Sequence, residues 1–209
     1  DEFIEAAYQQ DPRFMEISRL MNFGLVVPMY DEGARLNSKT AENPNGEDAL
    51  RRKITEFQWF KRRNPFFNGR MLFVDDGTPD NRSAYDVLRL WAQIRKERAL
   101  EGRPELPENQ VDILPISPVW KKKLGSYKGG AAVLGLYAMA RDGWADAVGY
   151  TDVDVSVDLR LFGLALGILA CDESDVVIGS RRARGSYVTG VPLEGKVSSL
   201  FFNWYTRIL

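Results

Sequence analysis

Five short apolar runs, separated by longer amphipathic segments, limit the possible folds of this sequence more than any other feature. The runs are rich in valine, isoleucine and leucine, and most lack strict alternation, which is typical of strands buried on both faces of a parallel sheet. We expect strands at 23–29, 70–75, 111–116, 146–151 and 174–180. Helical patterns fall at 47–63, 83–100, 129–141 and 159–170. The alternation predicts an α/β fold, a sandwich with a mostly parallel central sheet flanked by helices.

The composition excludes several functional classes. The chain has 209 residues, of which 44% are hydrophobic and 27% are charged, so it is long enough for one large globular domain. A net charge of -1 gives no basic field for nucleic acid. Because there is no histidine, any metal would have to be held by oxygen ligands. The single cysteine, Cys171, excludes an internal disulfide and favours a reducing compartment.

The apolar run at 161–171 is shorter than the roughly 20 residues of a membrane span. We interpret it as a buried helix, with an interfacial helix as the alternative. The first ten residues lack the order of a signal peptide. The sequence ends on the apolar segment "FFNWYTRIL", so we expect the chain to be part of a longer protein. The expected location is cytoplasmic, either free or peripheral to the cytoplasmic face of a membrane.

Acidic residues follow three of the expected strands. They are Asp31 and Glu32 after the first strand, Asp75 and Asp76 after the second, and Asp152 and Asp154 after the fourth. Ligands of open α/β sheets bind at the carboxyl ends of the strands. Carboxylates gathered at one edge repel each other, and a divalent cation would relieve that repulsion. The pattern therefore indicates a ligand site at this edge.

The segment "TDVDVSVD" (151–158) is the candidate metal site. In an extended chain the side chains of Asp152 and Asp154 share one face, because the period of a strand is two residues. Both could reach one Mg²⁺ or Mn²⁺ ion, which prefer oxygen ligands. The alternative is that these acids only cap a strand end. The segment "VDDGTPD" (74–80) is equally open between a turn and an acceptor for a ribose or base.

Two basic features accompany the acids. Lys128 and Gly129 open an expected helix, where a helix N-terminus and glycine favour an anion, with a glycine hinge as the alternative. Basic clusters occur at 119–128 and 180–185, and the second includes Arg181 and Arg182 directly after an expected strand. Arginine can bind phosphate in a bidentate manner, although a solvated face would also explain these charges. Neither a P-loop nor a dinucleotide-binding glycine motif is present.

The order of these motifs resembles the family 2 glycosyltransferases of the GT-A fold. It is most similar to the polyprenyl-phosphate sugar transferases, such as the dolichyl-phosphate glucosyl- and mannosyltransferases. The resemblance covers 23–185 and rests on "LVVPMYDEGARL", "LFVDDGTPDNRS", "KGGAAVLGLYAMA", "GYTDVDVSVDLRLFG" and "DVVIGSRRARGS". It implies one GT-A domain over 1–209, with a nucleotide-sugar-binding core at 23–180 and the start of the acceptor region at 181–209. The loop after the first strand is longer than expected for the family.

The resemblance also implies roles for individual residues. The nucleotide-binding set is Asp31, Glu32, Asp75, Asp76, Lys128, Gly129 and Asp152. The catalytic set is Asp154, Arg181 and Arg182, with the two arginines facing the acceptor or the phosphates. Asp152 and Asp154 match the family's metal-binding D-x-D motif, which holds Mg²⁺ or Mn²⁺ on the diphosphate.

The implied activity is hexosyl transfer from a UDP- or GDP-linked sugar to an acceptor, for which a polyprenyl phosphate at a membrane surface is one candidate. The residues assign no general base, and an already ionised phosphate acceptor would need none. Three alternatives stay open. They are a non-catalytic nucleotide-sugar-binding module, a retaining transferase acting on a small phosphorylated acceptor, and a nucleotidyltransferase. The last is disfavoured because no glycine-rich basic loop follows the first strand.

Overall fold

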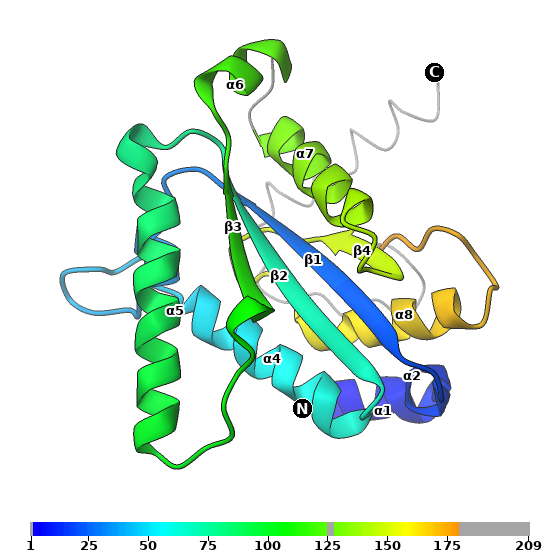
Figure 1. The fold of residues 1–209 in the computed structure, drawn as a ribbon. Helices are drawn as coiled ribbons and strands as arrows, with labels where there is room; N and C mark the ends of the chain where they lie inside the picture. Colours follow the sequence, from blue (N-terminus) through cyan, green and yellow to red (C-terminus); the bar gives the residue numbers. More distant parts are fainter. Residues whose placement is uncertain (1, 125–127, 180–209) are drawn as a thin grey trace, which may run out of the picture. The chain divides into compact units, whose positions relative to one another are not determined.

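Four parallel strands form the central sheet of the protein, described here from a computed structural model that covers residues 2–124 and 128–179. The strands are β1 (Met21–Met29), β2 (Phe67–Asp75), β3 (Val111–Pro115) and β4 (Ala147–Tyr150). Their order is β3-β2-β1-β4, and every neighbouring pair is parallel (Figure 1). The structure thus confirms the expected α/β sandwich and four of the five expected strands.

Helices precede, connect and follow the strands. They are α1 (Glu2–Gln10), α2 (Arg13–Glu16), α3 (Gly33–Leu36), α4 (Ala49–Arg63), α5 (Arg82–Leu100), α6 (Pro118–Leu124), α7 (Lys128–Arg141) and α8 (Phe162–Ala170). Short 3-10 helices lie at η1 (Pro79–Asn81), η2 (Glu108–Gln110) and η3 (Leu159–Leu161). The four expected helices correspond to α4, α5, α7 and the pair η3 and α8. The chain separates into two units, 1–175 and 176–209, and all these elements belong to the first.

Hydrophobic cores lie on both faces of the sheet. On one face, side chains of α1, α2, α4, α5 and α8 pack in a large cluster that includes Val27 of β1. On the other face, α7 packs on a smaller cluster that includes Val26 (Figure 1). Successive residues of β1 are therefore buried on opposite sides, which explains why its sequence is apolar without alternation.

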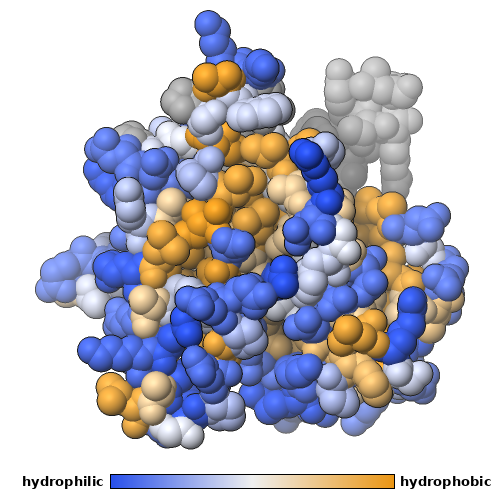
Figure 2. Space-filling model, in the orientation of Figure 1, coloured by the Kyte–Doolittle hydropathy of each residue, from blue (hydrophilic) through white to orange (hydrophobic). Residues whose placement is uncertain are grey.

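Helix α7 lies very close to the sheet. A Cβ atom at Gly135 would collide with Val26 and come within 2.7 Å of Val74, so only glycine permits this approach. Because the β3–α7–β4 connection joins parallel strands, α7 runs opposite to them and begins at their carboxyl ends. Apolar surface gathers over the sheet beside α7 (Figure 2), and Val133 and Tyr137 of the helix are exposed. Lys128, the first residue of α7, therefore lies at the strand-end edge.

The apolar run at 161–171 forms α8, as expected of a helix, and one side of α8 is buried at Gly163, Leu166 and Gly167, while its other residues are half-buried. Leu166 is 1% exposed within the large core. A Cβ atom at Gly167 would come within 2.9 Å of the main-chain nitrogen of Phe14 in α2, so the two helices are tightly packed. In the described part of the chain, no helix is both long and apolar enough to cross a lipid bilayer.

The expected strand at 174–180 is wrong over its described part, 174–179, which has no regular secondary structure. Val176 and Ile178 in this stretch are 69% and 82% exposed. A run of β-branched residues favours a strand only when a neighbouring strand supplies hydrogen bonds and a surface to pack against. Among the described residues, no strand pairs with this segment.

Candidate functional site

The acids predicted from the strand ends lie along one edge of the sheet. Strands β4, β1 and β2 are adjacent and parallel, so the residues that follow them emerge side by side. Met29 of β1 is paired with Asp75 of β2, and Val26 of β1 is paired with Tyr150 of β4. The arrangement confirms that the strand-end residues are neighbours. Their individual environments differ sharply.

Asp75 is fully buried and is used by its own chain. Its Oδ1 accepts a hydrogen bond from the main-chain nitrogen of Thr78 at 2.9 Å, and its Oδ2 accepts one from that of Ala84 at 3.1 Å. The side chain therefore closes the turn after β2 and caps the first turn of α5, where helical N–H groups lack partners. The turn interpretation of this segment accounts for both oxygens of Asp75.

Two buried hydroxyl groups, which the sequence analysis missed, join the turns after β1 and β2. The Thr78 hydroxyl accepts from the main-chain nitrogen of Asp31 at 3.1 Å and lies 3.0 Å from the Ser83 hydroxyl. The Ser83 hydroxyl also accepts from the nitrogen of Glu32 at 3.4 Å. Asp31 itself has a left-handed φ of 53° and an exposed side chain. The segment "TPDNRS" (78–83) contains both hydroxyl residues, and a threonine and a serine in a turn before a helix are the signal that could have indicated these contacts.

Asp76 differs from its neighbour because its buried carboxylate has no partner among the described residues. The residue is 1% exposed, and neither side-chain oxygen accepts a hydrogen bond. Burial raises the pKa of Asp76, the Lys121 ammonium opposes that shift, and Asp75 reinforces it. Lys121 donates to the main-chain oxygen of Asp76 at 2.6 Å and lies 4.7 Å from the ring centroid of Tyr30. A donor group of a ligand would satisfy this carboxylate.

Replacing Asp76 by asparagine is expected to raise the melting temperature by a few degrees at pH 7, because a neutral amide is less costly to bury than a carboxylate. A raised folded-state pKa favours the folded state at low pH, and that advantage is lost as pH rises through the folded-state pKa. The gain over the wild type should therefore shrink as pH falls toward 4. Thermal melts at several pH values test this, and a variant less stable than wild type at pH 7 would contradict it.

Arg35 of α3 lies among three carboxylates from three segments of the chain. Its Nη1 is 3.1 Å from Oδ2 of Asp154, and its Nε is 3.4 Å from Glu32 and 3.9 Å from Glu47. Burial raises the pKa of Glu32, and Arg35 and Lys128 oppose that shift. For Asp154, burial also acts to raise the pKa, but hydrogen bonds from Ser156 and the Arg35 guanidinium outweigh it and hold the pKa below its usual value. Neither Arg35 nor Glu47 was predicted from the sequence.

Lys128 is the partner of the other acid in the D-x-D motif. Its Nζ lies 2.9 Å from Oδ1 of Asp152, and both side chains are about half exposed. Gly129 follows in the first turn of α7 and is exposed. Lys128 and Asp152 thus meet at this edge as an ion pair. The cationic partner of Asp152 is Lys128, and that of Asp154 is Arg35. Arg181 and Arg182 lie outside the described residues.

The donor set at Asp152 and Asp154 fits a magnesium or manganese ion only in part. In the described residues, no group of three or more cysteine, aspartate or glutamate side chains is arranged to hold a metal. Mg²⁺ is commonly held by one or two carboxylates, with water and substrate phosphates completing its shell. Asp152 and Asp154 follow β4, which ends at Tyr150, and their side chains, 44% and 26% exposed, could supply those two carboxylates. A cation here would compete with the ion pairs to Lys128 and Arg35.

Fold and site together define an α/β protein with a cluster of charged side chains at the carboxyl edge of a parallel sheet. Comparisons of the chain with known protein families, curated proteins and solved structures gave no match.

Proposed function

We propose that this chain is a glycosyltransferase that transfers a sugar from a UDP- or GDP-linked donor, with Mg²⁺ or Mn²⁺ held by Asp152 and Asp154. The observation that carries the proposal is the D-x-D pair beside two cationic side chains at the strand-end edge. The buried, unpartnered carboxylate of Asp76 at the same edge supports it, because a nucleotide offers hydroxyl and N–H donors. The resemblance in motif order leads to the same class.

Each residue of the proposed site has a role in donor binding. The metal would act as a Lewis acid on the diphosphate leaving group. Lys128 and Arg35 would place fixed positive charge where negative charge develops. Arg35 can in addition bind two phosphate oxygens at once, which lysine cannot. Asp76 would accept hydrogen bonds from the ribose.

The proposed acceptor is a polyprenyl phosphate. Its phosphate oxygens are already largely ionised near neutral pH, so they need no general base, and the sequence assigns none. Arg181 and Arg182 would face the acceptor or the donor phosphates under this proposal. The chain would then act at the cytoplasmic face of a membrane without crossing it.

A non-catalytic nucleotide-sugar-binding module is the second candidate. The observation in its favour is that each acid of the D-x-D motif already has a cationic side chain as its partner, Lys128 for Asp152 and Arg35 for Asp154. These cations can bind a nucleotide without a metal. The two candidates therefore differ in whether binding depends on a divalent cation and whether the sugar is transferred.

Thermal melts with UDP, GDP and their sugar conjugates, each with and without Mn²⁺, test the proposal. A ligand at 100 times its dissociation constant stabilises a protein by about 2.7 kcal/mol. For a chain of this size the melting temperature should rise by roughly 5–10 °C. A shift that requires Mn²⁺, with transfer of the sugar to polyprenyl phosphate, supports the transferase. A shift without Mn²⁺ and without transfer supports the binding module, and no shift with any nucleotide contradicts both.

A further inference from the structure

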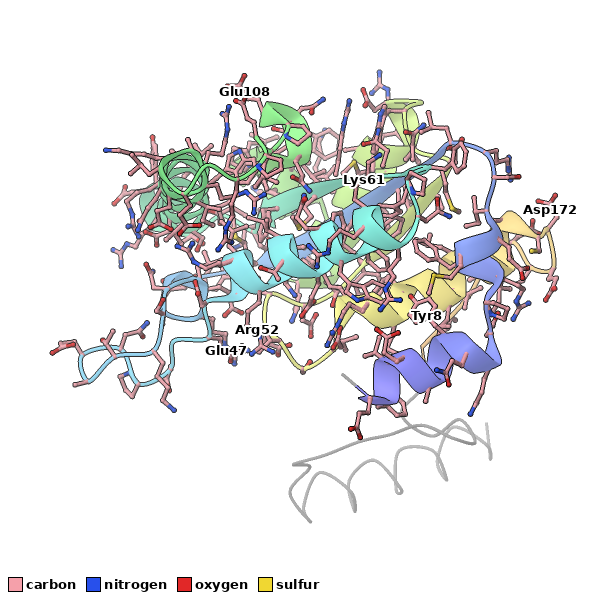
Figure 3. The ribbon with its side chains drawn as sticks, turned by 90° about the horizontal axis from the view of Figure 1, so that it is seen from below. Tyr8, Glu47, Arg52, Lys61, Glu108 and Asp172 are labelled. Atoms are coloured by element: carbon pink, nitrogen blue, oxygen red, sulfur yellow. The ribbon has the colours of Figure 1, made fainter. Side chains whose placement is uncertain are left out.

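The loop that carries the D-x-D motif (151–159) is held at three points. Two of the contacts come from α4 and one from the segment just before α4. Glu47 accepts a hydrogen bond from the main-chain nitrogen of Val155 at 3.1 Å. Lys53 donates to the main-chain oxygen of Asp154 at 3.1 Å. Glu56 accepts from the main-chain nitrogen of Leu159 at 3.0 Å. Figure 3 shows Glu47 beside this loop. The three side chains bind only main-chain atoms of the loop in these contacts, so they fix its path.

Lys53 is the most unusual member of the three. It is 1% exposed, and it lies on the same helix as the core residues Ile54 and Phe57. Burial lowers the pKa of Lys53, and the carboxylates of Glu56, Asp154 and Asp152 oppose the shift. An apolar residue of similar length would fill this position at a lower desolvation cost. Packing alone therefore does not explain a lysine here, whereas its bond to the loop does.

We infer that Glu47, Lys53 and Glu56 are positioning residues, which hold the D-x-D main chain in the geometry needed to bind a divalent cation and a diphosphate. This inference rests on the proposed function. The three residues would act through Asp152 and Asp154 rather than touch the ligand. Outer residues that orient metal ligands commonly change metal affinity by about 10–100-fold when removed. All three come from the long segment between β1 and β2.

Glu47 and Glu56 can each be replaced by glutamine as the conservative variant and by alanine as the disruptive one. Glutamine keeps a side-chain oxygen that can accept the same main-chain hydrogen bond, whereas alanine removes it. Thr55→Ala is the matched control, because the Thr55 hydroxyl bonds the main-chain oxygen of Arg51 within α4 itself. Lys53→Met keeps the length of the side chain without its donor.

The test combines two measurements on the full chain. Amide hydrogen exchange of Val155 and Leu159 in the unliganded protein reports the two loop contacts directly. We expect faster exchange at Val155 in Glu47→Ala and at Leu159 in Glu56→Ala. Mn²⁺ titration in the presence of UDP, and separately of GDP, should show affinity reduced by about 10–100-fold in both alanine variants and in Lys53→Met. The glutamine variants and Thr55→Ala should stay close to wild type.

The outcomes separate failure of this inference from failure of the proposed function. Faster exchange with unchanged Mn²⁺ affinity would mean that the contacts are structural only, which overturns the positioning role. Unchanged exchange in both alanine variants would overturn the loop contacts themselves. A wild-type chain that binds no Mn²⁺ and no nucleotide would overturn the proposed function, and the positioning role with it. If Lys53→Met does not fold, the glutamate variants carry the test.

Discussion

Replacing Asp154 by alanine is expected to abolish the Mn²⁺-dependent part of nucleotide binding. The variant loses one of the two carboxylates of the D-x-D motif, and a lone Asp152 with 44% exposure would hold the cation weakly. The rise of roughly 5–10 °C expected for the wild type with nucleotide and Mn²⁺ should disappear. Melts of both proteins with and without Mn²⁺, and calorimetric titration of the nucleotide, measure the effect.

The fold should survive this substitution. Arg35 keeps Glu32 at 3.4 Å and Glu47 at 3.9 Å as partners when Asp154 is removed. Asp158→Ala is the matched control from the same loop. The Asp158 carboxylate binds the guanidinium of Arg160 at 2.7 Å and caps η3, so its loss should lower stability and leave the Mn²⁺ effect intact. Equal nucleotide affinity of wild type and Asp154→Ala with Mn²⁺ present would refute the metal assignment.

Replacing Asp75 by alanine is expected to destabilise the chain by about 2–4 kcal/mol, which corresponds to a fall of roughly 5–15 °C in melting temperature. The physical reason is that two main-chain N–H groups, those of Thr78 and Ala84, lose their acceptor in a buried environment. The loss of the cap on α5 accounts for part of this value. Urea or thermal unfolding with two probes measures the change.

The neighbouring acid provides the contrast. Asp76→Asn should raise the melting temperature at pH 7, because the Asp76 carboxylate is buried without a partner while that of Asp75 has two. Adjacent aspartates in one turn are thus expected to affect stability in opposite directions. If Asp75→Ala leaves stability unchanged, the capping role assigned to Asp75 is wrong.

The positions of four strands followed from the sequence, although only the central strands β1 and β2 are largely buried on both faces, while the edge strands β3 and β4 are partly exposed. The runs around Val26 and Val74 are apolar without alternation, and the structure buries both residues fully. The run at 174–179 has the same composition but remains exposed at Val176 and Ile178. The difference is pairing with a neighbouring strand of the described sheet, which local composition does not encode.

The edge of the candidate site also followed from the sequence, because carboxyl ends of parallel strands meet at one side of the sheet. The ion pair of Asp152 with Lys128 could have been predicted from the same rule, because both residues were expected at this edge. Arg35, Glu47, Lys53 and Glu56 were missed, because their partners lie about a hundred residues away along the chain. Nothing in their local sequence distinguishes them from other charged residues of an amphipathic helix or a polar loop.

The sequence by itself determined the α/β class, four of the strands and the edge at which charged residues gather, because these depend on periodicity and on connection rules that act over short stretches of chain. Only the tertiary structure decided which charges meet. It separated Asp75, whose oxygens close a turn, from Asp76, whose oxygens have no partner in the described residues. It also placed Arg35 and Lys128 against the two acids of the D-x-D motif. The strength of such contacts depends on distance and burial, and packing of the whole chain sets both.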